Sequence, residues 1–108
     1  MSKKDLWRID NFLKDQYLIN KNKYFWPKQV SRVLKIDIGD IFVAIKEMEE
    51  KFKFKYIIIK DEKQLGEYST PCEAYDKAKE YSDNPLEIIF VFIELTDQYK
   101  KFLDEGSI

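Results

Sequence analysis

The stretch from Val30 to Glu50 constrains the fold of this chain more than any other part of the sequence. Leu34 and Ile36 are spaced as core residues, and Asp37 follows as a residue type that caps helix N-termini. After Asp37, apolar side chains recur at the spacing i, i+3, i+4, i+7 of a helix's inward face: Ile41, Ala44, Ile45 and Met48. The stretch therefore predicts two helices joined by a tight turn.

Three helices are predicted in the first half of the chain. The first covers residues 5–19, where apolar side chains recur every three or four positions. Pro27 stands at the first position of the second helix, which runs to about Lys35. The third helix is capped by Asp37 and continues to about Lys51. The chain therefore begins as a helical module.

A change to period-two alternation follows the third helix. Residues 52–60 alternate between bulky apolar side chains and lysines and then become apolar, which predicts a strand. A turn over residues 61–64 and a short strand over residues 65–69 complete a hairpin. The predicted order is thus helix, helix, helix and hairpin.

Residues 70–108 predict a further helix, strand and helix. Thr70 and Glu73 form a capping box around Pro71, so a helix begins there and ends near residues 83–85. Thr96 and Asp97 can cap a last helix that runs through Leu103.

Between these two helices, residues 86–95 are apolar on both faces. Their β-branched and aromatic side chains favour a buried strand, and a continuous helix over residues 85–103 is the alternative. A strand that is apolar on both faces needs cover on both sides, and few helices remain to supply it. We therefore expect a homodimer that buries part of this strand.

Composition limits the class of protein. With 108 residues, of which 44% are apolar, the chain can build a single globular domain. No apolar run is long enough to span a membrane, and the N-terminus lacks the apolar core of a signal peptide. The single Cys72 cannot form an internal disulfide. We therefore expect a cytoplasmic protein without a membrane partner.

The sequence contains few of the residue patterns that enzymes use for catalysis. The chain contains no histidine, so it has no imidazole base and no histidine-based metal site. Its three glycines form no phosphate-binding loop. We expect a protein that is not an enzyme and that uses no cofactor and no metal.

Charge is distributed unevenly along the chain, although the net charge is −1. Residues 1–63 carry 15 lysines and arginines against 10 acidic residues, or +5, whereas residues 64–108 carry 4 against 10, or −6. One interpretation is a face for a polyanion and a second face for another partner. The other interpretation is ordinary variation of surface charge.

Residues 5–69 resemble the winged helix-turn-helix superfamily in the Val30–Glu50 spacing, the capped turn and the hairpin that follows it. The resemblance implies an α+β fold in which residues 1–108 form one domain. Residues 5–69 would be the winged-helix core, and residues 70–108 would be a C-terminal helix-strand-helix extension that makes a dimer. It also implies binding of double-stranded DNA, with the third helix in the major groove.

The resemblance assigns two sets of residues to DNA binding. The first set comprises the basic residues of the second helix and of the hairpin, which would contact phosphates: Lys28, Arg32, Lys35, Lys53, Lys55, Lys60 and Lys63. The second set comprises the outward positions of the third helix, which would face base edges: Ile38, Gly39, Asp40, Phe42, Val43, Lys46 and Glu47. The second set is mostly apolar or acidic, whereas base edges are usually read by Arg, Lys, Asn, Gln, Ser or Thr.

Two functions follow from these sets. The first is a small DNA-binding protein, a dimeric transcriptional regulator or a protein of a plasmid or phage DNA site. The second is a protein-interaction module on a winged-helix scaffold, an adaptor or a phage or plasmid inhibitor of a host protein. In the second case Ile38, Phe42 and Val43 would form a docking patch instead of contacting thymine methyl groups.

Overall fold

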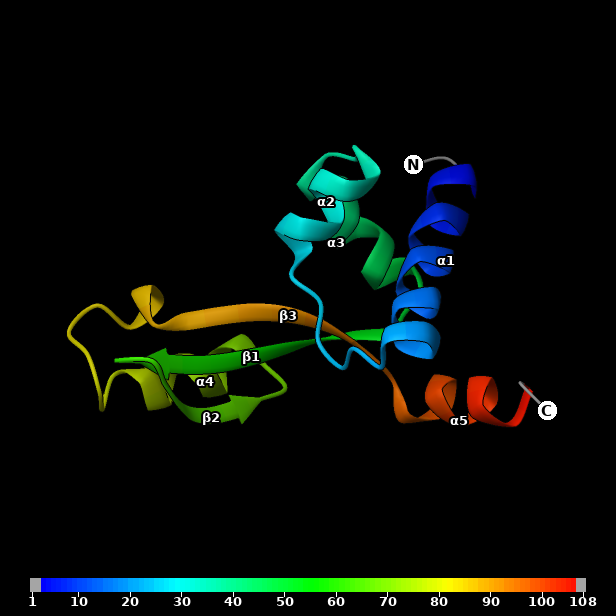
Figure 1. Cartoon of the computed structure of the whole chain (residues 1–108). Helices are drawn as coiled ribbons and strands as arrows, with labels where there is room; N and C mark the ends of the chain where they lie inside the picture. The colour runs from blue at the N-terminus through cyan, green and yellow to red at the C-terminus, as the bar shows by residue number, and fades with distance from the viewer. Residues whose placement is uncertain (1–2, 107–108) are drawn as a thin grey trace. The chain divides into compact units, whose positions relative to one another are not determined.

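The computed structural model of the chain describes residues 3–106 (Figure 1). Five α-helices, one short 3₁₀ helix and three strands lie within these residues, so the predicted α+β class is confirmed. The elements in order are α1 (Lys3–Asn20), α2 (Pro27–Leu34), α3 (Ile38–Glu47), β1 (Phe52–Lys60), β2 (Lys63–Tyr68), α4 (Pro71–Ala78), η1 (Pro85–Glu87), β3 (Ile89–Leu95) and α5 (Asp97–Gly106).

The chain forms two compact units. Residues 3–53 and 93–106 make up the helical unit, and residues 54–92 make up the hairpin unit. The chain passes between them within β1 and again within β3. The helical unit therefore contains α1, α2, α3 and α5, whereas β2 and α4 belong to the hairpin unit.

The predicted tight turn between the second and third helices is confirmed. Helix α2 ends where Lys35 adopts the left-handed conformation, with φ of 57°. The amides of Lys35 and Ile36 both donate to the carbonyl of Ser31, which closes the turn. The Asp37 carboxylate then accepts a hydrogen bond from the amide of Gly39 at 3.0 Å and caps α3. Helices α2 and α3 are thus joined by a tight, capped turn.

The inward face of α3 is the centre of the helical unit's core. The predicted inward residues of this helix are all buried: Ile41, Ala44, Ile45 and Met48. Ile9 and Leu13 of α1 and Val30 of α2 are buried in the same unit. Burying such side chains contributes about 1.5–3 kcal/mol each for the larger aliphatic residues, so this stripe stabilises the three-helix arrangement.

Helix α3 ends four residues earlier than predicted, at Glu47 instead of Lys51. The amides of Lys51 and Phe52 both donate to the carbonyl of Met48 at 2.9 Å, which closes a turn over Met48–Lys51. This turn lets Phe52 begin β1 with its side chain fully buried. Core packing of Phe52 therefore overrides the helical pattern of the preceding residues.

In the hairpin unit, β1 and β2 pair antiparallel around a two-residue turn. Lys60 pairs with Lys63, and the intervening Asp61 and Glu62 have φ of 53° and 65°. Positive φ at both central residues is the geometry of a type I′ turn, whose twist matches the flanking strands. The predicted turn over residues 61–64 is therefore too long, and β2 begins two residues before the predicted strand.

The strand predicted over residues 86–95 is confirmed for Ile89–Leu95, which form β3, and the alternative of a continuous helix over residues 85–103 is wrong. The preceding Pro85–Glu87 forms η1, because proline is favoured at the first position of a helical turn. β1 is the central strand of the sheet, in the order β2-β1-β3. Residues Phe92–Leu95 are buried within the single chain, so only the first residues of β3 lack full cover.

Both predicted C-terminal helix caps are confirmed. The hydroxyl oxygen of Thr70 accepts from the amide of Glu73 at 3.3 Å, and that of Thr96 accepts from the amide of Tyr99 at 3.2 Å. Helix α4 ends at Ala78, which is earlier than the predicted 83–85. Ala78 is buried against Ile58 and Ile88 and forms the core of the hairpin unit with them.

Candidate nucleic-acid interface

A basic stripe runs along the exposed face of α2. Lys28, Arg32 and Lys35 are all exposed, as the sequence predicts. Lys28 and Arg32 are spaced i, i+4, which places them on one side of the helix, and Lys35 follows as the C-cap residue; the helix contains no acidic residue. Three cations on a short rigid element can contact successive phosphates of one strand.

A hollow of about 370 Å³ lies beside this stripe. It is lined by Trp26, Lys28, Gln29, Arg32 and Val33. The lining includes two cations and no anion, and the Val33 side chain is 53% exposed. The face of α2 therefore combines positive charge with apolar surface.

The aromatic triplet Tyr24-Phe25-Trp26 enters the core only in part. The backbone of Phe25 pairs with Ile93 through two hydrogen bonds of 2.8 Å, so this segment is locally extended. Successive side chains of an extended segment point to opposite faces. Phe25 is accordingly buried, whereas Tyr24 and Trp26 are exposed.

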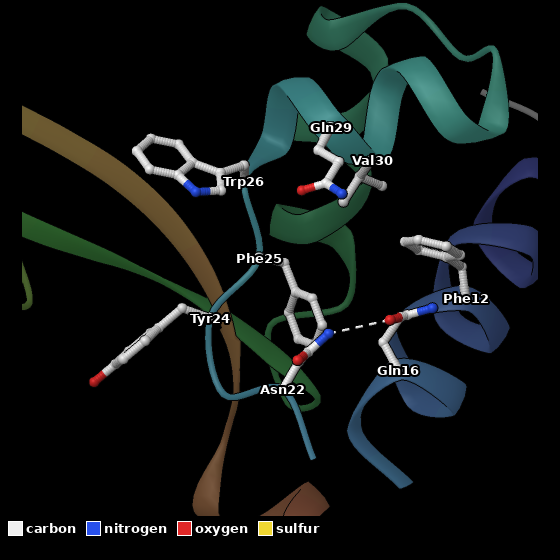
Figure 2. A pocket seen from close by; sticks show the side chains of 8 residues that line it. All are labelled: Phe12, Gln16, Asn22, Tyr24, Phe25, Trp26, Gln29 and Val30. Carbon is white, nitrogen blue, oxygen red and sulfur yellow. Dashed lines mark hydrogen bonds between the residues drawn. The ribbon is translucent and has the colours of Figure 1, made fainter. Parts of the chain in front are cut away.

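A small cavity separates this segment from α1 (Figure 2). Asn22 donates a hydrogen bond from Nδ2 to Oε1 of Gln16 at 3.1 Å, and the Gln29 carboxamide lies on the α2 side of the cavity. Its volume of about 50 Å³ is room for a few water molecules and not for a nucleobase. We assign it no ligand.

The residues predicted on the outward face of α3 lie at its surface. Ile38, Asp40, Val43 and Lys46 are exposed, and Phe42 is only half-buried. Lys46 is the single cation of α3, and the apolar side chains can offer only contacts to methyl groups. This face can read few hydrogen-bonding groups on base edges.

The other lysines predicted to contact phosphates are placed differently. Lys53 lies in the helical unit with its Nζ 3.3 Å from the carboxylate of Glu94, a residue that is only 7% exposed. Lys55, Lys60 and Lys63 belong to the hairpin unit, where Lys60 donates to the carbonyl of Tyr81. Of the seven predicted residues, Lys28 and Arg32 therefore line one hollow on α2, Lys53 lies beside Glu94, and three belong to the hairpin unit.

Sequence reasoning missed a polar cluster of Asp10, Lys51 and Tyr99. Asp10 accepts hydrogen bonds from the Tyr99 hydroxyl at 2.6 Å and from the Lys51 ammonium at 2.9 Å. Burial, together with the hydrogen bond and the charge of Asp10, raises the pKa of Tyr99. The three residues lie far apart in sequence, and no local pattern marks them.

The described part of the chain shows no feature of a metal site or a membrane span. Within residues 3–106, no three residues of the types His, Cys, Asp and Glu are grouped so that they could hold a metal ion. No helix in this range is long and apolar enough to cross a bilayer.

Comparison of the chain with protein-family models, with curated proteins and with solved structures finds no match in any of the three.

Proposed function

We propose that this chain is a winged-helix protein that binds the backbone of double-stranded DNA through its helix-turn-helix. The observation that carries the proposal is the exposed stripe of Lys28, Arg32 and Lys35 on a helix without acidic residues. Such cations release counterions from DNA when they contact phosphates, which supplies affinity without sequence information.

Helix α3 would lie in the major groove and contribute mainly apolar contacts to this interface. Ile38 and Val43 are exposed on its outward face and can contact thymine methyl groups in the major groove. Asp40 and Glu47 are acceptors, and in the major groove they suit base edges with an amino donor, chiefly the N4 amino group of cytosine. We therefore expect tight binding at low salt with modest sequence preference, as in a protein that coats or organises a DNA site.

The test is a triple substitution of Lys28, Arg32 and Lys35 by alanine. The matched control replaces Lys4, Lys23 and Lys101, which are also exposed, and so makes the same change in net charge. Affinity is measured by fluorescence anisotropy with a labelled duplex over a series of salt concentrations. The α2 variant should lower the salt slope, log K against log salt, by about 2.7, or 0.9 per phosphate contact. The control should keep most of the wild-type slope, and equal losses in both variants would refute the proposed interface.

Exposed apolar residues on the same surface favour a second candidate function, docking of a protein. Val33 and Val43 are 53% and 47% exposed, on α2 and α3. Val43→Asp separates the two functions better than a change of the half-buried Phe42. An added carboxylate in the major groove should weaken duplex binding on every sequence. Unchanged duplex affinity in this variant would show that α3 stays outside the groove and would favour the docking function.

A further inference from the structure

A second surface of the helical unit has an apolar hollow where α1, the turn before β1 and α5 meet. Its volume is about 490 Å³, and its apolar lining comes from Tyr99, Phe102 and Leu103 of α5. The Phe102 side chain is 67% exposed, whereas Tyr99 and Leu103 are buried. An exposed aromatic ring at the edge of an apolar depression offers surface that a partner can bury.

Tyr99 in the hollow is held by contacts within the helical unit. The rings of Tyr99 and Phe102 are stacked, with centroids 6.4 Å apart and an interplanar angle of 13°. Asp10 fixes Tyr99 from α1 through the 2.6 Å hydrogen bond and also binds the Lys51 ammonium. Docking therefore requires little further ordering of the Tyr99 side chain.

Charges around the hollow are balanced, which argues against a polyanion as its partner. The lining includes two cations, Lys14 and Lys51, and two anions, Asp10 and Glu50. Asp10 and Lys51 pair with each other. Among the described residues, Lys14 and Glu50 form no ion pair. One cation from α1 and one anion from the turn before β1 are thus left for a partner.

An unpaired cation and an unpaired anion on one patch make that patch complementary to itself. In a two-fold symmetric dimer the same patch of each copy meets the other, so every contact occurs twice. Lys14 of one copy can then pair with Glu50 of the other, and the reverse pair forms at the same time. The exposed Phe102 supplies the apolar centre that the middle of such an interface requires.

We propose that a second copy of this chain docks on the hollow formed by α1 and α5, with Phe102 at the centre and reciprocal pairs between Lys14 and Glu50. The surface is separate from the basic stripe of α2 and goes beyond the proposed DNA binding. It also differs from the dimer surface expected on residues 86–95, because it places the contact on α5 instead.

Multi-angle light scattering of the full chain at micromolar concentration tests the dimer. The wild type should show twice the chain mass of 13.1 kDa. Phe102→Asp should raise the dimer dissociation constant about thirtyfold or more, the loss expected for a central contact residue. Leu86→Asp is the matched control, because Leu86 is 76% exposed and lies in the segment of the other expected surface. A wild-type monomer, or dissociation by the Leu86 change and not by the Phe102 change, would overturn the proposal.

Charge reversal tests the reciprocal pairs without removing any apolar contact. Lys14→Glu should place two like-charged pairs across the interface and weaken the dimer, and Glu50→Lys should do the same. The double variant restores opposite charges in both pairs and should recover most of the wild-type association. Circular dichroism confirms that each variant is folded. A double variant that associates as weakly as the single variants would overturn the pairing. The duplex affinity of the α2 stripe is measured separately, so failure of either proposal leaves the other distinguishable.

Discussion

The hydroxyl of Tyr99 donates a hydrogen bond to the carboxylate of Asp10, with 2.6 Å between the two oxygens. The other carboxylate oxygen accepts from the Lys51 ammonium at 2.9 Å, and that ammonium also lies 5.5 Å from the centre of the Tyr99 ring. The ring meets Phe52 edge to face, with centroids 5.5 Å apart. One carboxylate thereby ties together α1, the turn before β1 and α5.

Replacing Asp10 by alanine should destabilise the chain by about 2 kcal/mol. The change leaves the Tyr99 hydroxyl and the Lys51 ammonium without their acceptor in a partly buried place, where an unsatisfied group costs about 1–3 kcal/mol. Asp15→Ala, at an exposed position of the same helix, should change stability by less than about 0.5 kcal/mol. Urea denaturation compares the two, and equal midpoints would contradict the structural role of the cluster.

Stability should fall at alkaline pH through Tyr99. Its pKa is raised above the ordinary 10.0, so the folded chain holds this proton more tightly than the unfolded chain. The stabilisation is therefore complete below about pH 10 and is lost as pH rises above that value. Tyr99→Phe should reduce the difference in unfolding free energy between about pH 9 and pH 11. If the variant loses as much unfolding free energy between these pH values as the wild type does, groups other than Tyr99 cause the loss.

The hairpin turn should become more stable when Glu62 is replaced by glycine. Glu62 has φ of 65°, a left-handed conformation that is costly for a residue with a β-carbon and free for glycine. We expect a gain of about 0.5–1 kcal/mol in the opening free energy of the β1–β2 amides, measured by hydrogen exchange. Glu62→Val should have the opposite effect, because β-branched residues avoid positive φ. Stabilisation by both substitutions would refute this account of the turn.

Local signals predicted the helices and strands that carry their own markers. Each of these signals lies within a few residues of the helix N-terminus that it predicts. They are the proline at the start of α2, the Asp37 cap and the Thr70 cap, and a helix begins at each of them. The inward stripe of α3 was predicted for the same reason, since helical spacing alone determines which residues share a face.

Features that depend on contacts between distant residues could not be predicted. The bridge between Phe25 and Ile93 leaves Tyr24 and Trp26 exposed. The sequence around Phe25 does not predict this pairing, because Ile93 lies far away along the chain. The early end of α3 likewise depends on the burial of Phe52 in the core. For the candidate interface, spacing placed Lys28 and Arg32 on one face of α2, but it did not show that the helix ends before Lys35. It could not show that Lys53 would instead lie beside Glu94.

The most direct test of the proposed function is to map where a DNA duplex contacts the chain. Titration of the ¹⁵N-labelled protein with a short duplex at low salt reports on each backbone amide in turn. Amide shifts should change mainly over residues 26–35 and over the exposed positions of α3, and moderate salt should reverse the changes. Absence of any shift at low salt, or shifts confined to α4 and α5, would contradict the proposed function.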